Sequence, residues 1–153
     1  MRVVNCKRRH IAAIKPQAEQ LCEMVDGVED IVDPTTLSMF AKTILSDDGR
    51  PIAVMGIVPV MARVATAWAI ISDEAVERHG PLLTIVAKRG LAKAASLGTF
   101  RRIDVMVRSD FDRAVEWAID LGFEVEGLKR NYGPEGNMDY IELAMLIDMP
   151  EAA

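Results

Sequence analysis

The clearest pattern in the chain lies between residues 51 and 98, where the spacing of apolar positions changes period. Residues 51–60 and 64–71 are two apolar, β-branched runs of strand length, separated by three residues. They predict an antiparallel hairpin. From Pro81 onward, apolar side chains recur every three or four positions, which predicts an amphipathic helix that ends at Gly98.

Further elements are predicted on both sides of this region. The patterns predict strands at residues 2–6, 101–107, 123–130 and 138–147, and helices at residues 14–24, from Asp33 onward and at residues 109–122, the last opened by a capping box of Ser109 and Asp112. A strand, a helix and a strand in succession form a right-handed crossover, so residues 64–71 and 101–107 are predicted to be parallel neighbours. The whole is an α+β domain, a mixed central sheet with helices on both faces.

Composition narrows the class of protein. The 153 residues contain no repeat or linker, which favours a single domain over residues 1–153. A net charge of −5 argues against binding to nucleic acid, and no apolar stretch reaches the 18 or so residues that cross a membrane. Cys6 and Cys22 have no metal-ligand or redox spacing, so we expect reduced thiols, no metal and a cytosol-like compartment.

The order of these elements resembles the GNAT (N-acetyltransferase-like) superfamily over about residues 40–147. Residues 80–98 carry the likeness, together with residues 113–124, which end in Leu-Gly-Phe-Glu. Within the superfamily the chain looks most like the GNAT-like internal virion protein A group of T7-type tailed phages, through residues 51–56 and 68–74. The resemblance implies the GNAT acyl-CoA N-acyltransferase fold, in which the strands at 64–71 and 101–107 diverge at their C-terminal ends.

The resemblance also implies acetyl-CoA as cofactor, with its pyrophosphate on backbone N–H groups at a helix start. The family pattern there is Gln/Arg-x-x-Gly-x-Gly/Ala, and this chain has Arg78-His79-Gly80-Pro81-Leu82-Leu83. Arg78 fits the pattern, whereas Pro81 removes one N–H donor and Leu83 places a bulky side chain where the family has a small one. The cofactor-binding residues implied in this way are Ile70, Ile71, Arg78, His79, Gly80, Leu82 and Leu83.

Catalytic groups are harder to assign. The family's general-acid Tyr falls on Ala118 and its usual Asn on Phe111, so the first position has no proton to give. Four residues are candidates to replace the missing catalytic groups: Asp73 and Glu74 as bases, and Tyr132 and Tyr140 as acids. The alternative reading is that the carboxylates cap or solvate a short helix and the tyrosines pack.

Two functions follow from the resemblance, and enzymatic activity stays open between them. The first is a phage GNAT-fold protein with an eroded acetyl-CoA site, serving virion assembly or host interaction, favoured by the changes at 83, 111 and 118. It would have virion or host proteins as partners and lie in the host cytoplasm or in the virion. The second is an active acyl-CoA-dependent N-acyltransferase acting on a protein or small-molecule amine.

Overall fold

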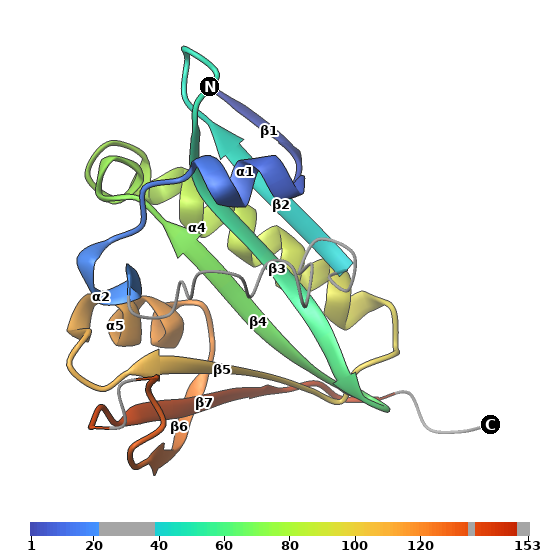
Figure 1. The fold of residues 1–153 in the computed structure, drawn as a ribbon. Helices are drawn as coiled ribbons and strands as arrows, with labels where there is room; N and C mark the ends of the chain where they lie inside the picture. The colour runs from blue at the N-terminus through green and yellow to red at the C-terminus, as the bar shows by residue number, and fades with distance from the viewer. Residues whose placement is uncertain (22–38, 135–136, 150–153) are drawn as a thin grey trace.

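A single mixed sheet forms the centre of the molecule (Figure 1). The structure, a computed structural model, describes residues 1–21, 39–134 and 137–149. Over these residues the sheet has seven strands in the order β1-β2-β3-β4-β5-β7-β6. The strands are β1 (Arg2–Asn5), β2 (Met39–Leu45), β3 (Pro51–Met61), β4 (Val64–Ile71), β5 (Arg102–Arg108), β6 (Glu124–Lys129) and β7 (Tyr140–Leu146). The helices are α1 (Arg8–Ala13), α2 (Ala18–Leu21), α4 (Asp73–Ser96) and α5 (Asp112–Asp120).

Helices cover both faces of the sheet, as the sequence predicts (Figure 1). On one face α1 contacts β2, where His10 Nδ1 lies 2.8 Å from the Thr43 hydroxyl. Neighbouring strand residues point to opposite faces, so Ile44 faces the other way and packs with Leu83 of α4. Ala118 of α5 packs on this second face against Ile103 of β5. The α+β architecture is therefore confirmed.

The predicted hairpin is confirmed, with β3 and β4 antiparallel and β4 ending where the sequence places it. Gly56 lies opposite Trp68, and a Cβ built on Gly56 would stand 2.9 Å from the indole Nε1. That is closer than Cβ atoms normally come to other heavy atoms. A glycine at this position is what lets the indole lie against β3.

Gly56→Ala is expected to lower the free energy of unfolding by about 1–3 kcal/mol, because the added methyl group must displace the Trp68 ring. Urea denaturation monitored by Trp fluorescence measures the change. Gly90→Ala is the matched control, since a Cβ on that helical glycine meets nothing within 4 Å and should be neutral or stabilising. Equal stability of Gly56→Ala and the unmodified protein would contradict the prediction.

The parallel pairing of β4 with β5 is also confirmed, and it is short. The two strands pair at Val64 with Arg102, Ala65 with Ile103 and Thr66 with Asp104. Past Thr66, β4 keeps pairing with β3 up to Ile71, while β5 keeps pairing with β7 up to Arg108. The strands thus diverge at their C-terminal ends and open a gap in the sheet.

The helix predicted at 14–24 differs from the structure. The chain forms α1, then an extended stretch from Ile14, then the short α2; residues 22–24 and Asp33 lie outside the described residues. Pro16 explains the break, because a proline disfavours the helical conformation of the residue before it.

The prediction of a capping box formed by Ser109 and Asp112 is also wrong. The Ser109 N–H donates to the Asp139 carbonyl at the end of the sheet, so α5 begins later, at Asp112, with Phe111 at its N-cap position and no side-chain cap.

In the described part of the chain, no helix is both long and apolar enough to cross a membrane.

Candidate functional site

A cavity of about 1010 Å³ lies where β4 and β5 diverge. Ala67 and Val105 line it from the face covered by α4 and α5, and Thr66 and Met106 line it from the opposite face. The cavity therefore passes between the two strands. Most of its wall is apolar, as in typical small-molecule sites.

The charged side chains that line this cavity all carry positive charge. Among the described residues they are Lys42, Arg89, Lys93, Arg108 and Arg113, and no Asp or Glu lines it. The whole protein is acidic, with a net charge of −5. Arg108 and Arg113 pair with Asp110 and Asp73, which reduces their effect. The distribution still favours an anionic ligand, or a ligand with an anionic part.

The N-terminal segment reaches the free edge of β4 beside the gap. Gln20 Nε2 donates to the Ala69 carbonyl at 2.8 Å, and Gln20 Oε1 accepts from the Ile71 N–H at 3.0 Å. The Gln17 N–H donates to the Ile71 carbonyl at 3.1 Å. From the other side of the gap, Arg108 of β5 donates to the Glu19 carbonyl at 3.2 Å. Residues 17–20 thus bridge the diverging strands.

The start of α4 is divided by a kink. Ser72 is the N-cap and accepts from the Ala75 N–H, and the backbone at His79 is non-helical, with φ −135° and ψ 22°. A second helical segment therefore starts at Gly80, with Pro81 in its first turn. The first turn of a helix presents backbone N–H groups that favour anions. Gly80 and Leu82 of this turn line the cavity.

Leu83 lies differently from what the family pattern suggests. Its side chain is only 4% exposed and packs in the core with Ile44 and Ile52. It therefore fills the space between α4 and the sheet, beside the cavity that it helps to line. The bulk of Leu83 at this position is accounted for by the core, so it gives no sign of a blocked anion site.

The residues predicted to bind the cofactor are divided between two places. The large cavity is lined by four of them: Ile71, Gly80, Leu82 and Leu83. Arg78 and His79 instead line a separate hollow of about 270 Å³, together with Ser46, Asp47, Asp48, Arg50 and Glu74. Ile70 lies on β4 opposite Val54 and is not among the described lining residues of either.

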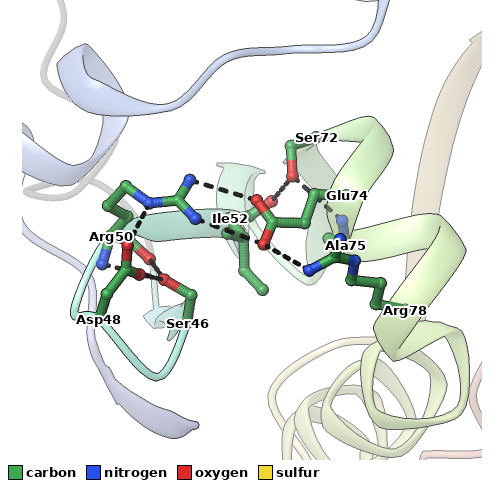
Figure 2. A network of polar contacts seen from close by, with 8 residues as sticks. All are labelled: Ser46, Asp48, Arg50, Ile52, Ser72, Glu74, Ala75 and Arg78. Atoms are coloured by element: carbon green, nitrogen blue, oxygen red, sulfur yellow. Dashed lines mark hydrogen bonds and ion pairs between the residues drawn. The ribbon is translucent and has the colours of Figure 1, made fainter.

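The smaller hollow belongs to a polar network that fastens the β2–β3 turn to α4 (Figure 2). Arg50 pairs with Asp48 at 2.7 Å and with Glu74 at 3.2 Å, and Arg78 lies 4.0 Å from Glu74. A hydrogen bond from the Ser46 hydroxyl, which has the larger effect, and one from Arg50 lower the pKa of Asp48 to about 2. Figure 2 shows the carboxylate of Glu74 between the two guanidinium groups. The network positions the first turn of α4.

The two carboxylates predicted as bases are therefore engaged elsewhere. Glu74 is held in this network, and Asp73 accepts from Arg113 of α5 at 3.1 Å. Neither is among the described residues that line the large cavity. The structure thus places both at the start of α4, in positions that suit the capping interpretation.

The two tyrosines do line the large cavity. Tyr132 and Tyr140 pack edge to face with ring centroids 5.3 Å apart. Tyr140 is 4% exposed and Tyr132 is 52% exposed. Ala118 and Phe111, at the family's Tyr and Asn positions, are both buried in the core of the α5 face. Among the described residues, the tyrosine hydroxyls that reach the cavity therefore come from the β6–β7 region.

Sequence reasoning missed the polar side chains that the N-terminal segment and α5 bring to the cavity. Besides Gln17 and Gln20, Trp117 Nε1 donates to the Thr84 hydroxyl at 3.0 Å and connects α5 to α4. No hydrophobic periodicity marks these residues. The one signal in the sequence is that the chain's two glutamines, Gln17 and Gln20, lie three positions apart. Over the described ranges, no cluster of three or more His, Cys, Asp or Glu is placed to hold a metal ion.

Comparison with solved structures identifies the fold. Ard1 from Thermoplasma volcanium matches with a TM-score of 0.78 at 11% identity, covering 96% of this chain and 97% of that one. The ribosomal-protein-S18-alanine N-acetyltransferase of Escherichia coli matches with a TM-score of 0.72 at 15% identity, covering 97% and 95%. A spermidine N-acetyltransferase SpeG mutant from Vibrio cholerae matches with a TM-score of 0.65 at 15% identity, covering 95% of each chain. The fold is the GNAT fold of N-acetyltransferases.

Sequence comparisons add nothing further. No protein-family model matches the chain, and no curated protein matches its sequence. The Escherichia coli and Vibrio cholerae proteins are named as N-acetyltransferases, and none of the three structures links the chain to a phage virion protein. The phage part of the prediction therefore rests on the sequence resemblance alone.

Proposed function

We propose that this protein binds acyl-CoA in the cavity between β4 and β5 and transfers the acyl group to an amine. The observation that carries the proposal is the divergence of β4 and β5 after three paired residues, around a cavity of about 1010 Å³. The shared fold of N-acetyltransferases supports it. In such a transfer the amine nitrogen attacks the thioester carbonyl and the CoA thiolate leaves.

The residues around the cavity suit the parts of acyl-CoA. The backbone edge of β4 from Ala69 to Ile71 offers a carbonyl and an N–H to an amide-bearing arm. The start of the Gly80 segment and the positive side chains suit its phosphates. Apolar groups such as Ala67 and Val105 exclude water from the place where the strands part. Because side chains of both sheet faces line the cavity, donor and acceptor have room to approach from opposite faces.

The charge of the lining also bears on the acceptor. A polyamine carries several positive charges, and a site for it needs carboxylates. In the described ranges the cavity wall holds five cations and no carboxylate. Although a spermidine N-acetyltransferase shares the fold, we propose an acceptor with at most one positive charge, such as a peptide N-terminus or a small amine.

Ala69→Phe is expected to weaken acetyl-CoA binding at least tenfold, because the ring fills the cavity beside the β4 edge. Isothermal titration calorimetry with the purified protein measures the affinity. Ala62→Phe makes the same substitution in the exposed β3–β4 turn and should bind as the unmodified protein does. Equal affinities in all three proteins would place the binding site elsewhere, and no binding by the unmodified protein would overturn the proposed function.

The second candidate is a protein that keeps the fold without turnover. The burial of Ala118 and Phe111 in the hydrophobic core favours it, because both positions lack the polar groups that the family uses. A role in a phage virion, with virion or host proteins as partners, belongs to this candidate. Absence of acetyl-CoA binding in the same titration would favour it over the acyltransferase.

A further inference from the structure

The two glutamines of the N-terminal segment occupy the place beside β4 where an extended ligand would lie. We propose that this glutamine pair, Gln17 and Gln20, controls access of an amide-bearing ligand arm to the β4 edge. An amide of the pantetheine arm displaces the Gln20 side chain, and Gln17 Oε1 accepts a hydrogen bond from the bound arm. The proposal rests on the proposed acyl-CoA function and assigns it two residues outside the family motif.

Gln20 binds β4 in the way that another strand would. Its side-chain amide donates to the Ala69 carbonyl and accepts from the Ile71 N–H. These two backbone groups face the gap past the last β4–β5 pair, at Thr66. In an extended chain with two amides, the N–H of one amide and the C=O of the next face the same side and can make the same pair of hydrogen bonds to a strand edge. Gln20 therefore occupies the groups that a ligand amide needs, and the two exclude each other.

Gln17 provides the second, independent observation. Its side chain is 3% exposed and lines the cavity, and its Oε1 is buried without a hydrogen-bond partner in the described structure. Buried side-chain oxygens are nearly always paired, because an unpaired one loses its hydration without compensation. The missing partner is a donor, and the N–H and O–H groups of a pantetheine arm are donors of the right kind. No carboxylate or cation is needed on the ligand at this point.

The position of the segment explains why the pair acts at the gap. The Gln17 N–H is fixed to the Ile71 carbonyl, and Arg108 of β5 holds the Glu19 carbonyl. The backbone of residues 17–20 is thus held by both diverging strands. The Gln20 side chain turns away from β4 without movement of this backbone, while Gln17 Oε1 stays beside the cavity.

The proposal predicts opposite effects of the two substitutions on acetyl-CoA affinity. A general loss of structure would instead weaken binding in both variants. Gln20→Leu frees the β4 edge and is expected to tighten acetyl-CoA binding by about 3- to 10-fold. Gln17→Leu removes the acceptor and is expected to weaken it by a similar factor, without loss of stability, because the unpaired oxygen is removed. Lys15→Leu, an exposed position in the same segment, is the control. Adenosine 3′,5′-bisphosphate, which lacks the pantetheine arm, should bind all four proteins equally.

The experiment is calorimetry with these two ligands, joined to nuclear magnetic resonance of the unmodified protein labelled with [¹⁵N]glutamine. With two glutamines in the chain, each side-chain NH₂ gives its own signal pair. Acetyl-CoA should shift both pairs, and adenosine 3′,5′-bisphosphate should shift neither. If both variants bind acetyl-CoA as the unmodified protein does, or both bind it more weakly, the glutamine proposal is overturned and the acyl-CoA site stands. If the unmodified protein binds no acetyl-CoA, both proposals are overturned.

Discussion

Leu83→Ala is expected to lower the free energy of unfolding by about 2–5 kcal/mol and to leave acetyl-CoA binding no tighter. The family pattern alone suggests the opposite, namely that a smaller residue here reopens an anion site. The structure buries the Leu83 side chain between α4 and the sheet, against Ile44 and Ile52. Truncation therefore leaves a cavity in the core, where the lost contacts are not replaced. Urea denaturation and calorimetry with acetyl-CoA measure the two quantities.

Ile85→Ala is the control for this substitution. Ile85 lies on the same helix and is 46% exposed, so its truncation should cost much less than that of Leu83. An acetyl-CoA affinity that rises tenfold or more in Leu83→Ala, with stability unchanged, would contradict our interpretation. It would mean that Leu83 does obstruct the start of the Gly80 segment.

The sheet was predictable because its signals are local. The apolar runs that form β3 and β4 have strand length and clear ends, and β4 begins and ends where the pattern predicts. The parallel contact between β4 and β5 then follows from the crossover through α4, which returns the chain to the end of the sheet where β4 began. The divergence after Thr66 came from the family resemblance, since no residue pattern in either strand encodes it.

Side-chain direction was not predictable from the motif. The pattern around Gly80 fixes spacing along the chain, but a kink at His79 decides which side chains face the core. That kink turns Leu83 inward and leaves Arg78 in a separate hollow. Local sequence does not determine such a change of direction, because it depends on how α4 packs on the sheet.

The glutamine pair was missed for a different reason. Gln20 contacts Ala69 and Ile71, which lie 49 and 51 positions away in the sequence. A single polar side chain in a short, irregular segment has no periodicity, and only the tertiary structure shows which strand edge it meets. The unpaired oxygen of Gln17 is likewise visible only once its burial is known.

Slow catalysis is the second large effect that we expect. With saturating acetyl-CoA, kcat for a peptide with a free N-terminus should lie about 10²–10⁴-fold below the roughly 10 s⁻¹ typical of enzymes. Ala118 has no proton for the leaving thiolate, and Asp73 and Glu74 are ion-paired outside the described cavity wall. Spermidine should be a still poorer acceptor, because the cavity presents only cations to it. Thiol release measured across pH 6–9 tests both statements.

The tyrosines decide whether the general acid has been lost or has moved. Tyr132 lines the cavity and is half exposed, whereas Tyr140 beside it is buried. If catalysis is slow because no group donates a proton, Tyr132→Phe leaves kcat within about twofold. Tyr140→Phe is the matched control, with an equal chemical change in the same ring pair. A kcat near 10 s⁻¹ that drops at least 100-fold in Tyr132→Phe alone would contradict this prediction, and it would assign the proton donor to the β6–β7 connection in place of α5.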